Sequence, residues 1–335
     1  MDWFGRLIST DFDELRQAFA EWDHEYDQIA PGPFRGEMTF GQFGTMQVSR
    51  VSWHNRIRYR GQTPPDSFAL ALTLTRRGHG RRMGERVGRD DVLLQRPGRE
   101  AEFVAPHAWD AFVVSIPRAE FLKYSRAYFR TASDDLDLFH GLAKLGSRQA
   151  GLLRQEVRLY CDVLEAACSG RDTSEEDIRA LGRISRQIVR DVCGTILSRE
   201  RCEIAPPNSR RDRALVMDAE AYVRSQSNRN VGILELCEVL AVSERTLHYA
   251  FQRNVGRSPA SWIRTIRLNR VRRQLRGSDS AFRLVKSVAI ENGFCHLSRF
   301  AATYRAQFGE LPSDTVRLRT SGYARGAGTP LSVVR

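Results

Sequence analysis

Two stretches of the chain decide its fold: GILELCEVLAVSERTLHYAFQRNVGRSP at residues 232–259 and VKSVAIENGFCHLSRFAATYRAQFGELP at residues 285–312. In each stretch an aromatic residue is followed by a glycine and then a proline, at the same offsets. These residues are Phe251, Gly256 and Pro259 in the first stretch and Tyr304, Gly309 and Pro312 in the second. A pattern that recurs at fixed offsets indicates two copies of one supersecondary unit.

The first copy predicts a helix, a tight turn and a second helix. Gly232 is a possible N-cap for a short helix that ends before Ala241, and Ser243 is a good N-cap for the next. In the second helix Leu247, Ala250 and Phe251 face inward, whereas Arg245, His248, Tyr249 and Gln252 face outward. This arrangement places its second helix in the major groove of DNA.

The second copy predicts the same arrangement. Val285, Val288 and Ala289 pack one short helix, Gly293 supplies the turn, and Phe300, Tyr304 and Phe308 anchor the following helix. Its outward residues are His296, Ser298, Arg299 and Ala302. Between the copies, residues 259–277 predict one long helix with an Arg-rich exposed face. Such a connector would hold the two outer helices about 34 Å apart, which is one turn of DNA.

The spacing of apolar residues changes several times along the N-terminal part. Apolar residues at helical spacing predict a helix over residues 11–28. Short β-rich runs over 34–117 predict a small antiparallel barrel or sandwich. Over 147–199 the spacing predicts an antiparallel helical pair, which packs on the barrel or against a second subunit.

These patterns predict a two-domain α+β protein. The expected parts are an N-terminal domain at 1–202, a linker with paired prolines at 203–209, an all-α domain at 210–320 and a Gly-rich disordered tail at 321–335.

Charge is unevenly distributed along the chain. Residues 208–320 hold 20 Lys and Arg against 10 Asp and Glu, which accounts for ten of the twelve net positive charges. A basic domain rich in arginine favours double-stranded nucleic acid as its partner. The sequence has no apolar stretch long enough to span a bilayer, and its first residues lack the pattern of a signal peptide. We therefore expect a cytoplasmic protein without a membrane partner.

Other candidate sites in the N-terminal half are weaker. His54, His79 and His107 lack the spacing of a cupin metal site, so we expect neither a metal nor a cofactor. Four aromatic residues either line an apolar ligand pocket or fill a core, and core packing is favoured: Trp53, Phe68, Trp109 and Phe112. No nucleophile elbow, carboxylate pair or phosphate loop supports catalysis.

The C-terminal segment resembles the DNA-binding domain of the AraC/XylS regulators from about Val231 to Val316. The resemblance rests on V-S-E-R-T-L-H-Y-A-F, G-R-S-P, I-R-L-N-R-V-R-R-Q-L, V-A-I-E-N-G-F and F-G-E-L-P-S. It implies that three residues of each unit read bases: Arg245, His248 and Tyr249 in the first, and Ser298, Arg299 and Ala302 in the second. Ala241 and Ala302 depart from the family pattern, which usually has Gly and often Arg there.

A weaker similarity links the chain to the ethanolamine-utilisation regulators of this family, through YDQIAPGPFRGEMT, TLHYAF and GFCHLSRFAATY among other stretches. The resemblance implies a cupin-like β-barrel that senses a small-molecule effector or mediates dimerisation. It also implies promoter DNA and RNA polymerase as partners, with activation of transcription as the outcome. The alternatives are a cupin-like enzyme, an effector-independent DNA-binding protein, and an RNA-binding or architectural protein.

Overall fold

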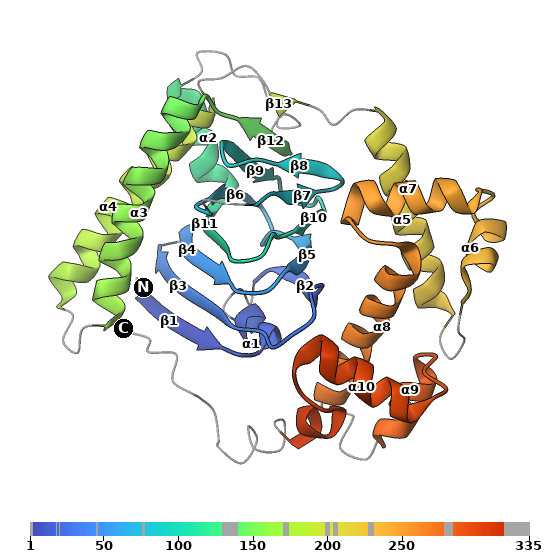
Figure 1. Cartoon of the computed structure of the whole chain (residues 1–335). Helices are drawn as coiled ribbons and strands as arrows, with labels where there is room; N and C mark the ends of the chain where they lie inside the picture. The colour runs from blue at the N-terminus through green and yellow to red at the C-terminus, as the bar shows by residue number, and fades with distance from the viewer. Residues whose placement is uncertain are drawn as a thin grey trace.

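The computed structural model shows an N-terminal β-rich domain flanked by helices and a C-terminal helical domain (Figure 1). It describes residues 3–317, except 18, 20, 45, 76–77, 129–139, 170–173, 198–201, 204–206, 227–230 and 278–283. The tail predicted to be disordered, 321–335, lies outside the described residues. The two-domain α+β architecture predicted from the sequence is confirmed.

The strands of the N-terminal domain form two antiparallel sheets. One has the order β1-β3-β4-β11-β6-β9-β12-β13 and the other β2-β5-β10-β7-β8. The strands are β1 (Trp3–Ser9), β2 (Asp23–Gln28), β3 (Gly36–Phe43), β4 (Met46–Trp53), β5 (Ile57–Gln62), β6 (Ser67–Thr73), β7 (Gly80–Arg82), β8 (Glu85–Val87), β9 (Asp91–Gln95), β10 (Ala101–Val104), β11 (Trp109–Pro117), β12 (Gly141–Lys144) and β13 (Cys202–Glu203). The predicted barrel is therefore not closed, because the described strands pair as two separate sheets.

The helix predicted over 11–28 is wrong in its second half. Helix α1 spans only Phe12–Gln17, and residues 23–28 form β2. In β2, His24 and Tyr26 are buried whereas Asp23 and Glu25 are exposed. This alternation is the period of a strand, but the preceding apolar residues at helical spacing concealed it.

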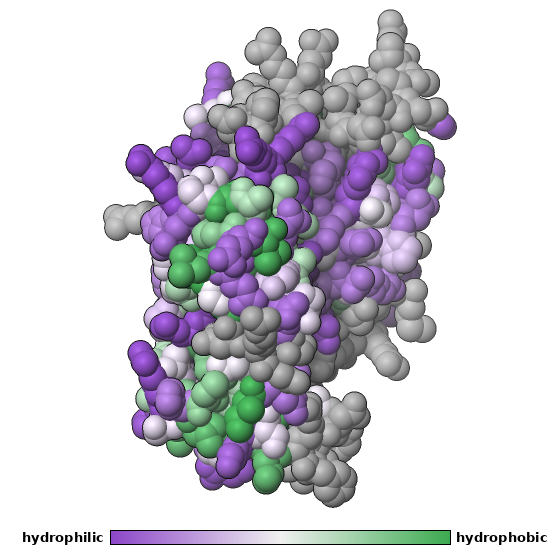
Figure 2. All heavy atoms as spheres, turned by 90° about the vertical axis from the view of Figure 1, so that its right-hand side faces the viewer, coloured by the Kyte–Doolittle hydropathy of each residue, from purple (hydrophilic) through white to green (hydrophobic). Residues whose placement is uncertain are grey.

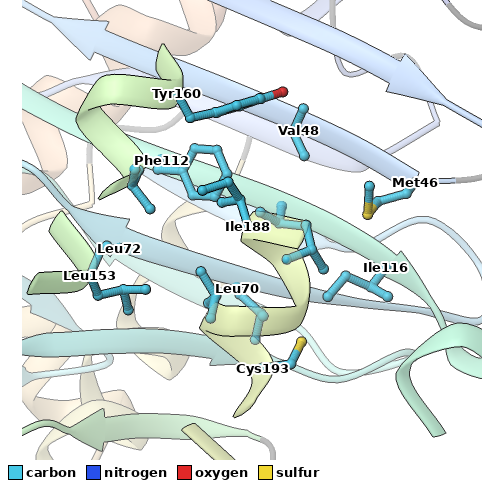
Figure 3. Close-up of a cluster of buried hydrophobic side chains, with 14 of the residues drawn as sticks. Met46, Val48, Leu70, Leu72, Phe112, Ile116, Leu153, Tyr160, Ile188 and Cys193 are labelled. Atoms are coloured by element: carbon cyan, nitrogen blue, oxygen red, sulfur yellow. The ribbon is translucent and has the colours of Figure 1, made fainter. Parts of the chain in front are cut away.

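The predicted helical pair is confirmed and covers the larger sheet. It consists of α3 (Ser147–Ser169) and α4 (Glu175–Leu197). A further helix, α2 (Arg118–Tyr128), packs against α4, and the sequence did not reveal it. Residues of α3 and α4 and of β4, β6 and β11 share one core (Figure 3). Phe112 of β11 meets Tyr160 of α3 with their ring centroids 5.9 Å apart. The stripe that begins at Leu153 therefore packs inside the subunit.

The C-terminal domain is helical, as predicted. Its helices are α5 (Pro207–Ser225), α6 (Ile233–Val239), α7 (Glu244–Val255), α8 (Pro259–Arg276), α9 (Val285–Glu291) and α10 (Leu297–Phe308). The predicted linker 203–209 extends from the end of β13 into the first residues of α5. No helix within the described ranges is long and apolar enough to cross a lipid bilayer.

Candidate nucleic-acid interface

The first helix-turn-helix unit consists of α6 and α7. The Ser243 side chain accepts a hydrogen bond from the backbone N–H of Thr246 and caps α7, as predicted. Leu247 and Phe251 are fully buried in the core that this unit shares with α5 and α8. All four residues predicted to face outward on α7 are exposed: Arg245, His248, Tyr249 and Gln252.

The second unit consists of α9 and α10. Phe300 and Tyr304 are buried on the inner face of α10, and Tyr304 bonds Thr315 through their hydroxyl groups at 2.8 Å. The four residues predicted to face outward are exposed: His296, Ser298, Arg299 and Ala302. His296 occupies the N-cap position but forms no side-chain cap hydrogen bond. Since the sequence predicts that α7 and α10 enter the major groove, we call them the reading helices.

Arginine side chains support the exposed face of α7. The Arg245 guanidinium carbon lies 5.5 Å from the centroid of the Tyr249 ring, and that of Arg253 lies 5.9 Å from it. Arg253 also pairs with Asp212 at 3.3 Å. These contacts hold the Tyr249 ring at the surface beside two cations. The outward pattern of α7 did not single out Arg253.

Helix α8 connects the two units and buries most of its residues. Ser258 caps it, Pro259 occupies its first turn, and Trp262 and Asn269 are fully buried. The predicted Arg-rich exposed face is wrong for its C-terminal half. Arg272 is buried and pairs with carboxylates of the N-terminal domain.

A concave surface of about 530 Å³ lies between the two units. The start of α6, one side of α8 and the start of α10 line it, and its charged side chains come from Arg264, Arg267 and Arg299. Arg299 thus belongs both to a reading helix and to this basic hollow. Such a surface suits a phosphate backbone, because guanidinium groups bind phosphate oxygens bidentately.

The turn of the first unit contains a strained alanine. Ala241 has φ +52°, in the left-handed region, whereas the second unit has Gly293 at φ +81°. Left-handed backbone costs an alanine about 1 kcal/mol relative to glycine.

We therefore expect Ala241→Gly to stabilise the C-terminal domain by up to about 1 kcal/mol. The released strain is partly offset by the greater freedom of glycine in the unfolded chain. Chemical denaturation of both proteins measures the difference. A matched Ala260→Gly change at an exposed site on helix α8 should instead destabilise the protein. If both variants lost the same free energy of unfolding, Ala241 would not be strained.

The N-terminal domain holds an aromatic cavity of about 80 Å³ between its two sheets. Its lining includes Trp22, His24, Tyr26, Trp53, Tyr59, Arg82, Gln95, Glu102, Phe103 and Trp109. Burial lowers the pKa of His24 to about 4, so its ring is neutral at pH 7. Two of the four aromatic candidates, Trp53 and Trp109, line this cavity, whereas Phe68 and Phe112 pack in the core of Figure 3.

A buried ionic network joins the two domains. Arg58 of β5 is fully buried and donates hydrogen bonds to Glu102 at 2.6 Å and to Glu220 of α5 at 2.7 Å. Glu220 also accepts a hydrogen bond from the indole N–H of Trp262 in α8, at 2.6 Å. Burial alone would lower the pKa of Arg58, but the carboxylates around it outweigh this and raise it well above its ordinary value.

A second set of contacts fixes α8 against β2. The Asn269 side chain accepts from the backbone N–H of Gln28 at 2.8 Å and donates to its carbonyl at 3.0 Å. Arg273 donates to Asp27 at 2.6 Å. Burial alone would raise the pKa of Asp27, but Arg273 and Arg58 overcome it and lower that pKa. These side chains are 241 or more residues apart, so sequence spacing did not reveal them.

The N-terminal domain also touches the C-terminal ends of both reading helices. Arg81 donates a hydrogen bond to the carbonyl of Arg253 in α7, and the N–H of Gly32 donates to the carbonyl of Ala306 in α10 at 3.0 Å. The residues nearer the N-termini of the two helices remain exposed. The N-terminal domain therefore braces both helices without covering the predicted base-reading residues.

Two family models match this chain. An AraC-binding-like domain matches residues 13–182, and a helix-turn-helix domain matches residues 236–318. The chain belongs to the AraC/XylS family. Members of this family are DNA-binding transcription regulators, so the exposed faces of α7 and α10 belong to a protein that binds DNA.

The chain is also similar to individual known proteins. The chain is 26% identical over 284 residues to the XylDLEGF operon transcriptional activator of Pseudomonas putida, and the match covers 82% of each chain. It is 30% identical over 103 residues to the probable thc operon regulatory protein of Rhodococcus erythropolis, covering 31% of each. Among solved structures, the AraC-like transcriptional activator CuxR is 13% identical with a TM-score of 0.41, covering 85% of this chain and 99% of that one.

Proposed function

We propose that this regulator activates transcription by reading two neighbouring segments of promoter DNA with α7 and α10. The observation that carries the proposal is the division of each reading helix into a buried face and an exposed face. The proposed DNA contacts are Arg245, His248, Tyr249, Gln252, His296, Ser298, Arg299 and Ala302, all of which are exposed. Since α8 is embedded between the units, it acts as a rigid spacer that sets their separation.

Control by a small-molecule effector in the aromatic cavity is part of this proposal. The smaller sheet separates the cavity from the C-terminal domain. On β2, Tyr26 lines the cavity while the adjacent Asp27 pairs with Arg273 of α8. On β10, Glu102 lines the cavity and also accepts from Arg58. A molecule that moves these strands would therefore change the contacts that brace α8.

We also propose a homodimer through the outer face of α3 and α4. Leu152, Leu159 and Val163 form a stripe on α3 and are 61%, 66% and 42% exposed, and Ile184 of α4 is 41% exposed. These residues recur at intervals of seven and four, which is the spacing of a helix seam. Large exposed hydrophobic residues in one stripe mark an association surface.

We expect Leu159→Glu to weaken self-association at least tenfold, because it introduces a charge at the centre of the stripe. Analytical ultracentrifugation over a range of concentrations measures the effect. Leu234→Glu is the matched control, since Leu234 is 72% exposed but lies on α6. A wild-type protein that remains monomeric at every concentration would refute the dimer.

A protein that activates transcription also needs a protein partner. RNA polymerase is the proposed protein partner, and exposed apolar side chains such as Leu234 and Val239 of α6 offer it a surface. Figure 2 shows green apolar areas on the side of the molecule that the C-terminal domain occupies. The proposed site of action is the cytoplasm. Membership in the ethanolamine-utilisation subfamily stays a prediction, since the relatives named above control other operons.

The alternative functions have weaker support. Both family models that match the chain, the AraC-binding-like domain and the helix-turn-helix domain, belong to transcription regulators, so a cupin-like enzyme is not favoured. Effector-independent binding leaves the aromatic cavity between the sheets without a role. We therefore favour an effector-controlled activator.

In vitro transcription tests the proposal. The template carries a site selected by the full chain from a random duplex library, placed upstream of a core promoter. We expect the protein to increase transcript from this template and not from one with a scrambled site. Small amines and aromatic metabolites are then added to find the effector. Tight site-specific binding without any increase in transcript would contradict activation.

A further inference from the structure

A second cavity, of about 330 Å³, lies where the two domains meet. Four arginines line it: Arg224 from the end of α5, and Arg267, Arg270 and Arg273 from α8. Its carboxylates are Glu25 of β2 and Glu291 of α9. The lining therefore has two more positive than negative charges.

Helix geometry explains why three arginines of α8 converge there. Each step of three residues turns a helix by about 300°, so three such positions spread over an arc of about 120°. Arg267, Arg270 and Arg273 thus fan out over one side of α8. Leu268 and Leu275, which are buried, occupy its opposite side.

Carboxylates lie at different distances from these arginines: Asp27 pairs closely with Arg273, at 2.6 Å, whereas Glu220 is 3.8 Å from Arg224. Glu25 is half exposed and lies 3.9 Å from Arg224 and 4.0 Å from Arg273, both long ion pairs. The Nη2 atom of Arg224 is buried and has no hydrogen-bond partner. Arg270 donates to the backbone carbonyl of Arg224, at 3.3 Å. Partial burial lowers the pKa of Arg267.

We propose that this arginine cavity binds a phosphate group. The four guanidinium groups around one cavity suit a phosphate, because its oxygens accept paired hydrogen bonds from guanidinium groups. The group comes either from a small phosphorylated molecule or from the DNA backbone, since Arg267 also lines the concave surface between the two units. Because Glu25 belongs to β2 and the arginines to the C-terminal domain, a bound phosphate replaces a contact between the domains. This site is independent of base reading by Arg299.

The first arm of the test uses inorganic phosphate and pyrophosphate on the full chain. Thermal unfolding is followed with each anion and with sodium chloride at matched ionic strength. We expect phosphate to raise Tm by about 2 °C or more in the wild type and in Arg264→Gln, which alters an exposed arginine of α8 outside this cavity. The shift should vanish in the double variant Arg267→Gln/Arg270→Gln, relative to its own Tm in chloride. Glu25→Gln should enlarge the shift, a gain that misfolding does not mimic.

The second arm identifies DNA as the source. If phosphate leaves Tm unchanged, Arg270→Gln, which alters this cavity but not the concave surface between the two units, should lower the slope of log K against log salt for duplex DNA by about 0.9 for each lost phosphate contact. Arg179→Gln, at an exposed position on α4, should leave the slope unchanged. A phosphate-dependent shift assigns the site to small anions, and a lower slope alone assigns it to DNA. If neither the phosphate-dependent shift nor the lower slope were observed, the proposal would be wrong.

Discussion

Replacing Glu220 by leucine should lower the free energy of unfolding by about 3–5 kcal/mol, because it leaves a buried cation short of a partner. Glu220 is only 2% exposed in its side chain and accepts hydrogen bonds from both Arg58 and Trp262. Leucine fills a similar volume but leaves both donors unsatisfied in a dry environment. Urea denaturation of the full chain measures the loss.

Two further variants make this result interpretable. Glu220→Gln keeps an acceptor for Trp262 and should lose less stability than Glu220→Leu. Glu175→Leu removes an exposed partner of Arg179 on α4 and should change stability by less than about 1 kcal/mol. If Glu220→Leu were as stable as Glu175→Leu, the network would not hold the domains together.

The second large effect concerns DNA recognition by Arg299. Its replacement by alanine should weaken binding to the selected site by roughly tenfold to a hundredfold, the worth of a bidentate contact with guanine. Random duplex should lose little affinity, because non-specific binding depends on phosphate contacts. Competition binding at fixed salt, with both DNAs and both proteins, measures the difference.

Arg305→Ala is the matched control for Arg299→Ala. Arg305 is also exposed on α10, but six residues further along the helix and therefore about 240° around it. The two variants lose the same charge, so only the position differs. Equal losses on specific and random DNA for Arg299→Ala would make it a phosphate contact.

The sequence predicted the C-terminal domain well because its information is local. The cap Ser243 and the turn residue Gly293 act within a few residues of their own position. Periodic apolar residues then separate the inner from the outer face of each helix. The helical pair α3 and α4 was predicted for the same reason.

The interface between the domains was not predictable in this way. Arg58 contacts Glu220 across 162 residues of sequence, and Asn269 contacts Gln28 across 241. Nothing in the spacing of these residues marks them as partners. Arg272 and Arg273 appeared as two more cations of an Arg-rich helix, but the structure places them against carboxylates of the N-terminal domain. The strand β2 was missed because its alternation follows directly on a helical pattern.

The proposed base contacts are inferred from the exposure of these side chains and from the family resemblance. The exposed faces of α7 and α10 define where DNA can bind, but the identity of each base depends on the operator. Ala302, with no polar group on its side chain, offers only an apolar contact to the thymine methyl group.

The rigid pairing of α7 and α10 is tested most directly by altering the spacing within the selected site. Five base pairs are inserted between the two recognised segments, which rotates one segment by about half a turn of DNA. Affinity should then fall to that of a site with one segment scrambled, because embedded α8 keeps the helices from following the rotation. Unchanged affinity after the insertion would mean that the two helices do not read DNA as one fixed unit.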